Sequence, residues 1–129
     1  MPRATTRITT VGRVIVSVAD QDRALDFYEG TLGFEKIADI PFGDGSRWIE
    51  VQPPGGGCAI ALGRPPEGVP VGGAMTGIVL QTTDIDGDQA ALRAAGVDID
   101  DVMRSDPPVP PMAFFRDQDG NHLLLVQSE

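Results

Sequence analysis

The sequence has few of the residues on which metal binding, disulfide bonding and nucleophilic chemistry depend. Its 129 residues include one cysteine, one histidine, one tryptophan and one tyrosine. Because Cys58 is the only cysteine, an intramolecular disulfide is excluded, and the reducing cytoplasm is the compartment that we predict. The residues beside Cys58, which are Gly57, Ala59 and Ile60, are typical of a buried strand, so we expect an inert thiol.

Basic residues are also scarce, since 10 lysines and arginines stand against 19 aspartates and glutamates and leave a net charge of -9. Without a basic surface to displace counterions from phosphates, we expect no binding of nucleic acid. The acidic balance indicates a soluble protein or, alternatively, one that prefers cationic ligands. No apolar run approaches the roughly 20 residues that cross a bilayer, and residues 1–10 lack the apolar core of a signal peptide. We therefore predict a cytoplasmic protein with no membrane partner.

What the chain does contain is an internal repeat. The segment Val14–Phe34 returns in fainter form at Val79–Val97. In both copies a short apolar strand ends at an aspartate, Asp20 or Asp84, and these two residues lie 64 positions apart. A helical pattern of about three turns and a glycine follow each aspartate. A duplicated unit in so short a chain predicts a pseudo-symmetric fold with a cleft between its halves.

Each half is expected to fold as strand, helix and three further strands. The helices run from the aspartate caps to Gly33 and to Gly96, the second covering Ile85–Ala95. The strands expected from apolar alternation are Arg13–Val18, Glu35–Ile40, Arg47–Gln52, Cys58–Leu62, Thr76–Thr82, Val97–Val102, Ala113–Arg116 and Asn121–Gln127. Residues 1–7 are expected to form a loose leader. We predict one domain with an N-terminal βαβββ module at 8–64, a linker at 65–74 and a C-terminal βαβββ module at 75–127.

Three segments of the chain carry a family resemblance, and they read VADQDRALDFYEGTLGFE, RWIEVQPPGG and FFRDQDGNHLLLVQ. They resemble the vicinal oxygen chelate superfamily, which includes glyoxalase I, extradiol dioxygenases, methylmalonyl-CoA epimerase, fosfomycin-resistance enzymes and bleomycin-resistance proteins. The similarity covers about Arg13 to Gln127. One departure is Gln118, which replaces the proline of the usual DPDGN turn and affects the stiffness of that turn. The resemblance implies an α+β fold in which two βαβββ modules form a curled, mostly antiparallel sheet around a cavity.

The resemblance also implies a homodimer, with modules that pair within one chain or across two chains. Metal-dependent members hold their ion with His or Glu on four inward-facing strands. Carried over by register, those positions are Arg13, Ala61, Gly77 and Leu124, none of which is a ligand for a divalent metal. We therefore predict no metal and no other cofactor. The loss of ligands leaves space and apolar surface for a small organic molecule.

Residues two positions from an inward-facing residue also point inward, which extends the candidate lining of the cavity. The ligand-binding candidates are Arg13, Ile15, Ser17, Trp48, Glu50, Ala61, Gly77, Val79, Gln81, Met112, Phe114, His122 and Leu124. Arg13 either grips a carboxylate or carbonyl oxygen or simply reaches solvent. Trp48 and Glu50 share one face of their strand, and together they suit a flat or cationic ligand if that face is inward. The opposite parity makes Trp48 an ordinary packing residue.

Two functions follow from this lining. The first is a metal-free binding protein similar to the bleomycin-resistance branch, which confers antibiotic resistance by sequestering an organic compound. The second is a metal-independent isomerase, epimerase, lyase or cyclase of secondary metabolism. In the enzyme, His122 or Glu50 moves a proton and Arg13 holds the developing oxyanion. A metal-dependent lyase or dioxygenase is disfavoured by the missing ligands.

Overall fold

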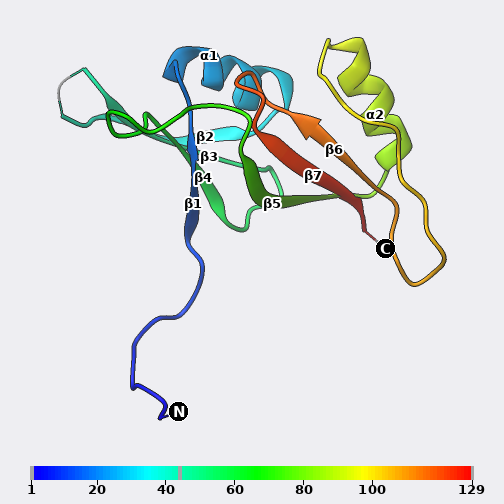
Figure 1. Ribbon diagram of the computed structural model, residues 1–129, viewed down its shortest axis with the longest axis horizontal. Helices are drawn as coiled ribbons and strands as arrows, with labels where there is room; N and C mark the ends of the chain where they lie inside the picture. The colour runs from blue at the N-terminus through cyan, green and yellow to red at the C-terminus, as the bar shows by residue number, and fades with distance from the viewer. Residues whose placement is uncertain (1, 44, 129) are drawn as a thin grey trace.

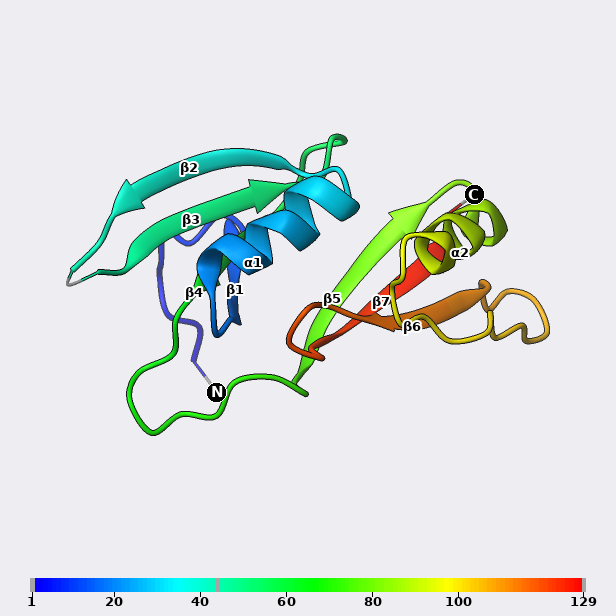
Figure 2. The same ribbon diagram turned by 90° about the horizontal axis from the view of Figure 1, so that it is seen from above.

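The computed structural model describes residues 2–43 and 45–128, which form two β-sheets with helix on one face of each (Figures 1 and 2). The elements are β1 (Arg13–Ser17), α1 (Gln21–Leu25), the π-helical segment η1 (Asp26–Thr31), β2 (Glu35–Pro41), β3 (Arg47–Gln52), β4 (Ala59–Gly63), β5 (Met75–Thr82), α2 (Ile85–Ala94), β6 (Met112–Arg116) and β7 (His122–Gln127). No helix among the described residues is long and apolar enough to span a bilayer.

The two sheets repeat one topology. In the first sheet the strand order is β1-β4-β3-β2, with β1 parallel to β4 and the other neighbours antiparallel. In the second sheet the order is β5-β7-β6, with β5 parallel to β7 and β6 antiparallel to it. The duplicated α+β fold is therefore confirmed. In the described part of the chain it consists of two separate, unclosed sheets, which lie side by side in Figure 2.

The predicted helix signals have the expected geometry. The Asp20 carboxylate accepts hydrogen bonds from two amides of the first turn of α1, at 2.9 and 3.1 Å, and Asp84 accepts one from the Gly87 amide at 3.0 Å. Both helices are followed by glycines with left-handed backbone, Gly33 (φ 77°) and Gly96 (φ 84°). The first helix is α-helical only at its start and continues as η1.

The predicted strand Val97–Val102 is wrong, because this segment makes only isolated bridges to β6. Ile99 is paired with Phe115, and Met103 with Met112. Ile99 and Met103 are four residues apart, whereas their partners Phe115 and Met112 are three apart, so a bulge interrupts the ladder. The second sheet consequently has three regular strands instead of the expected four.

The hydrophobic core lies between the helices and the sheets and continues from one half of the molecule to the other. Ile49 and Val51 of β3 point into it with exposed fractions of 1% and 0%. Tyr28 is fully buried, and the rings of Phe27 and Phe115 lie 6.5 Å apart across the two halves. Burial of each large apolar side chain stabilises the fold by about 1.5–3 kcal/mol.

The β6–β7 turn locks the two halves together through a buried carboxylate. One oxygen of Asp117 accepts hydrogen bonds from the Tyr28 hydroxyl at 2.8 Å and from the Asn121 side chain at 3.0 Å. The same Asn121 amide donates to the carbonyl of Ser17 in β1 at 3.1 Å. Burial and the charge of Asp117 hold the pKa of Tyr28 well above its usual range, so the hydroxyl remains a donor. These contacts set how the two sheets lie relative to each other.

Gly72, near the end of the connection between the sheets, lies against the same turn. Its φ is +93°, and a Cβ there meets the backbone carbonyl of Asp119. We expect Gly72→Ala to lower the free energy of unfolding by about 2–3 kcal/mol, because strain and a backbone clash add together. Gly68→Ala is the matched control, since Gly68 also has positive φ (+86°) but open space around it. Urea unfolding compares the two, and equal losses would show that the contact with Asp119 is unimportant.

Candidate functional site

Each sheet has one face that no helix covers, and most of the predicted site residues lie on these two open faces. In the first sheet Ile15, Ala61 and Glu50 are aligned across β1, β4 and β3, opposite the core-facing Ile49 and Val51. We call this surface the first open face, and it comprises Arg13, Ile15, Ser17, Trp48, Glu50 and Ala61. Sequence alternation left open which face of β3 points inward. In the structure Trp48 lies on the face away from the helix.

Three of these side chains form one connected group. The Nε of Arg13 donates to Oε1 of Glu50 at 3.0 Å, and the indole Nε1 of Trp48 donates to Oε2 at 2.6 Å. Glu50 is buried, whereas the Arg13 side chain is 54% exposed. Both carboxylate oxygens therefore have donors, and among the described residues the two Nη groups of Arg13 have no partner. The group offers hydrogen-bond donors and an indole ring to a ligand, and no free negative charge.

The electrostatics of Glu50 follow from these contacts. The hydrogen bond from Trp48, followed by the bond and charge of Arg13, lowers the pKa of Glu50, although burial opposes this shift. Glu50 is consequently ionised near neutral pH and is a weak proton acceptor. This arrangement fits a positioning role for Glu50 better than the general-base role considered from the sequence.

The lowered pKa of Glu50 gives a pH prediction. When folding lowers the pKa of a carboxyl group, the ionised group stabilises the fold at any pH above its pKa in the unfolded chain, which is near 4.5. This stabilisation is lost as the pH falls through the lower pKa of the folded protein. We expect the melting temperature of Glu50→Gln to lie below that of the wild type at pH 7 and the difference to shrink below pH 4.5. Thermal melts from pH 7 to pH 3 measure this. A difference that is constant with pH would contradict the ionic role of Glu50.

The second open face belongs to the other sheet. Val79, Leu124 and Phe114 are aligned across β5, β7 and β6, and Gln81 and Met112 flank Val126 in the next row. This face comprises Met75, Val79, Gln81, Met112, Phe114, His122 and Leu124. It is an apolar surface with one imidazole and one amide.

His122 has an unusual position on this face. Its ring lies 6.3 Å from that of Phe114 in an edge-on arrangement, and its Nδ1 is buried with no hydrogen-bond partner among the described residues. Buried polar atoms normally have a partner, so this nitrogen is an exception that the contacts of the described residues do not explain.

Sequence reasoning missed a charged cluster beside His122. Arg116 donates to Asp98 at 2.9 and 3.0 Å and to Asp100 at 2.7 Å. These bonds lower the pKa of both carboxyl groups, with a smaller contribution from His122. The sequence signal is the pair Asp98 and Asp100, two positions apart, but it does not identify Arg116 as their partner.

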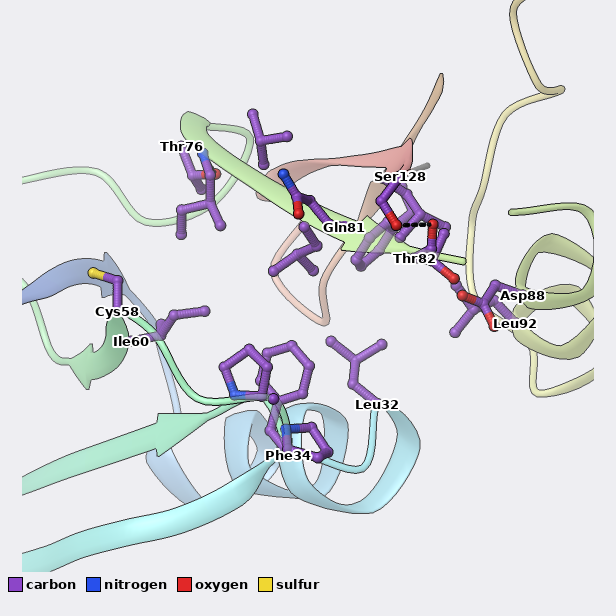
Figure 3. A pocket seen from close by; sticks show the side chains of 18 of the residues that line it. Leu32, Phe34, Cys58, Ile60, Thr76, Gln81, Thr82, Asp88, Leu92 and Ser128 are labelled. Atoms are coloured by element: carbon purple, nitrogen blue, oxygen red, sulfur yellow. Dashed lines mark hydrogen bonds between the residues drawn. The ribbon is translucent and has the colours of Figure 1, made fainter. Parts of the chain in front are cut away.

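A cleft of about 940 Å³ separates the two halves on the helix side (Figure 3). Leu32, Phe34 and Ile60 line it from the first half, and β5 and Leu92 line it from the second. Of the predicted site residues, only Gly77, Val79 and Gln81 of β5 lie along it. The cleft is therefore distinct from the first open face.

Cys58 lies at one end of this cleft, and the prediction of a buried strand thiol is wrong. The residue is exposed and precedes β4, which begins at Ala59. The reason is that Gly56 and Gly57 both adopt positive φ (83° and 92°), so the preceding turn extends further than the apolar run suggests.

The family's metal positions do not fit a divalent ion in this chain. Arg13 is engaged with Glu50, and Ala61, Gly77 and Leu124 have no donor atoms in their side chains. Among the described residues, no group of three or more His, Cys, Asp or Glu side chains is arranged to hold a metal. That the protein binds no metal in the cell stays a prediction.

The structure does not bring the two open faces together within one chain. Ile15 on the first face is 67% exposed and Val79 on the second is 54% exposed, so neither face covers the other. Within the described ranges 2–43 and 45–128, no strand of one sheet pairs with a strand of the other. Arg13, Trp48 and Glu50 therefore lie on one open face, and Phe114, His122 and Leu124 lie on the other.

Solved structures with this fold cover nearly the whole chain. The antibiotic binding protein TnmS3 from Streptomyces sp. CB03234 is 36% identical with a TM-score of 0.85, over 97% of this chain and 100% of that protein. A glyoxalase/bleomycin resistance protein/dioxygenase superfamily member from Sphaerobacter thermophilus DSM 20745 is 37% identical with a TM-score of 0.86, over 95% and 100% of the two chains.

Sequence comparison agrees with these structural matches. The uncharacterized protein YetH of Bacillus subtilis (strain 168) is 30% identical over 125 residues, which are 93% of this chain and 99% of YetH. Residues 10–125 match the family model described as Glyoxalase/Bleomycin resistance protein/Dioxygenase superfamily. Together with the two related sheets described above, this match shows that the chain belongs to the glyoxalase/bleomycin resistance/dioxygenase superfamily.

Proposed function

We propose that the protein is a cytoplasmic binding protein that sequesters a small organic ligand without a metal and without changing it. The observation that carries the proposal is the Arg13–Glu50–Trp48 group on the first open face. Its face includes Arg13 and Ala61, two of the positions that the family resemblance assigns to metal ligands, and it presents an indole ring and guanidinium N–H groups there. The similarity to TnmS3, an antibiotic binding protein, supports the same class of ligand.

The character of the ligand follows from this group. The Arg13–Glu50 ion pair has no net charge, and the guanidinium is the part of it that faces solvent. A flat ligand that stacks on Trp48 and accepts hydrogen bonds from Arg13 fits better than the cationic ligand that the net charge of the chain allowed. Carbonyl, phenolate and carboxylate oxygens are the acceptors that we expect.

The proposed cavity is completed by two chains. Each open face exposes apolar side chains, such as Ile15 and Val79, that a monomer leaves in water. If the first face of one chain covers the second face of its partner, Trp48 and Arg13 meet Phe114 and His122 across an enclosed space. A two-fold dimer then contains two equivalent cavities.

Native mass spectrometry of the protein with a panel of antibiotics and aromatic metabolites tests the proposal. We expect an intact compound bound to a dimer, at up to two molecules per dimer. The appearance of a compound with a changed mass, or of an isomer of unchanged mass that chromatography of the released compound resolves, in protein treated with a chelator would contradict sequestration and support an enzyme.

The second candidate function is a metal-independent isomerase, epimerase, lyase or cyclase. The observation that favours it is the position of the His122 imidazole on the second open face, edge-on to the Phe114 ring, because an imidazole is suited to moving a proton. This function predicts that His122→Ala abolishes turnover and leaves ligand affinity largely intact. If only affinity changes, His122 is a binding residue.

A further inference from the structure

Gln21, the first residue of α1, is a buried polar side chain outside the proposed ligand site. Its exposed fraction is 5%. Its Nε2 group donates hydrogen bonds to the carbonyl of Arg47 at 2.6 Å and to the carbonyl of Leu62 at 2.9 Å, and its Oε1 accepts one from the Arg47 amide at 3.1 Å. Only this orientation of the amide places donors against both carbonyl groups, so both of its N–H groups are used.

The three bonds of Gln21 join β3 to β4 where the ladder between the two strands has ended. Glu50 is the first residue of β3 that is paired with β4, although β3 begins at Arg47. The backbone N–H and C=O of Arg47 are bonded to Gln21, which also holds the Leu62 carbonyl of β4. Because buried backbone groups need partners, the Gln21 amide takes the place of ladder hydrogen bonds at this end of the sheet.

The Arg47 side chain holds the same point of β3 a second time. Its Nε and one Nη donate to the two carboxylate oxygens of Asp39 in β2, at 3.0 and 2.9 Å, and the other Nη donates to Asp22 in α1 at 2.6 Å. The two parallel bonds to Asp39 are more directional than a single ion pair, and they lower the pKa of Asp39 to about 2. The start of β3 is thus tied to α1, β2 and β4.

The residue after Arg47 is Trp48, whose side chain points to the other side of the sheet. Arg47 bonds to α1 on the helix-covered face, so Trp48 lies on the first open face, opposite to Gln21 (Figure 2). The indole donates to Glu50 at 2.6 Å, and its ring lies 5.9 Å from that of Phe42, which is 61% exposed. Little other packing surrounds this aromatic pair, so the position of the indole depends on where the start of β3 is held.

We propose that Gln21 is a positioning residue for ligand binding, which fixes the start of β3 so that the Trp48 indole already has its binding orientation before a ligand arrives. Without the Gln21 amide, two backbone groups of Arg47 and one of Leu62 lose their partner, and the indole samples other orientations. A ligand then has to order the indole, and its affinity falls although Gln21 touches no ligand. This inference rests on the proposed function, in which Trp48 contacts the ligand.

The first test uses the fluorescence of Trp48, which is the only tryptophan of the chain and reports its own position without a label. Gln21→Leu removes all three hydrogen bonds, and we expect acrylamide to quench the ligand-free variant about twofold faster than the wild type. Val97→Ala, at a buried position in the other half of the molecule, is the matched control, which should lower the melting temperature and leave quenching unchanged. Unchanged quenching in Gln21→Leu, or equal acceleration in Val97→Ala, overturns the proposal.

Gln21→Glu carries the same test if Gln21→Leu does not fold. This variant keeps the shape of the side chain and the acceptor for the Arg47 amide, but it places a carboxylate oxygen against two carbonyl groups. Quenching of Trp48 should be faster than in the wild type at neutral pH. As the pH is lowered and the introduced carboxyl group becomes protonated, it donates to one carbonyl again, so quenching should return toward the wild-type rate. Quenching equal to that of the wild type at every pH overturns the proposal.

Binding of naphthoate, a flat aromatic carboxylate, separates the positioning role from the proposed function. Calorimetry should give Gln21→Leu an affinity at least about fivefold weaker than that of the wild type, with a still larger loss for Trp48→Ala. If Trp48→Ala weakens binding and Gln21→Leu does not, the positioning role is wrong. If Trp48→Ala binds naphthoate as the wild type does, the proposed function fails at this face, and the quenching of the ligand-free protein still decides the role of Gln21.

Discussion

Replacing Asp117 by alanine is expected to lower the free energy of unfolding by about 3–5 kcal/mol, the largest effect of any single substitution that we predict. Asp117 accepts four hydrogen bonds, from the Tyr28 hydroxyl, the Asn121 side chain and the backbone amides of Asp119 and Asn121. Its loss leaves the fully buried Tyr28 hydroxyl without an acceptor. The melting temperature should fall by roughly 10–20 °C.

Two variants test whether the loss of stability comes from the hydrogen bonds that Asp117 makes between the two halves or from a general sensitivity of the protein to substitution. Tyr28→Phe removes one donor and leaves Asp117 with three, so a smaller loss of about 1–2 kcal/mol is expected. Glu67→Ala alters an exposed acidic residue of the connecting segment and should change stability by less than about 0.5 kcal/mol. If Asp117→Ala is as mild as Glu67→Ala, the β6–β7 turn does not hold the two halves together.

Replacing Trp48 by alanine is expected to weaken ligand binding about 10- to 100-fold, or about 1.4–2.8 kcal/mol. The substitution removes the stacking surface and also the indole donor that holds Glu50 at 2.6 Å. Affinity is measured by calorimetry with whichever compound native mass spectrometry identifies. Under the binding hypothesis, no product appears with either protein.

Trp48→Phe distinguishes the two contributions of the indole. It keeps a flat ring and removes the N–H group that bonds to Glu50. If stacking dominates, Trp48→Phe should retain most of the affinity that Trp48→Ala loses. Val109→Ala, at an exposed apolar position in a loop, is the control and should bind as the wild type does. Equal affinity of Trp48→Ala and wild type would remove the first open face from the ligand site.

Much of the fold was predictable because its signals are local. Alternation in Arg47–Gln52 gave the correct limits of β3, and Asp20 and Asp84 marked the starts of both helices. The same alternation paired Trp48 with Glu50 on one face. It could not decide which face was buried, because that depends on where the helix packs.

The features that sequence reasoning missed depend on contacts between distant residues. Tyr28 and Asp117 are 89 positions apart, and neither apolar periodicity nor turn chemistry links them. The bulge opposite β6 arises from a one-residue mismatch that the pattern of Val97–Val102 does not reveal. The relative placement of the two open faces likewise depends on the turn at Asp117, so the sequence could not show whether one chain completes a cavity.

The central claim is that each ligand cavity combines the first open face of one chain with the second open face of its partner. Mixing Trp48→Ala chains with Phe114→Ala chains under subunit exchange tests it most directly. Each mixed dimer then regains one cavity with both wild-type faces, so calorimetry should detect wild-type affinity in about one quarter of all cavities. If the mixture binds no better than the separate variants, the two faces do not meet across chains and the account is wrong.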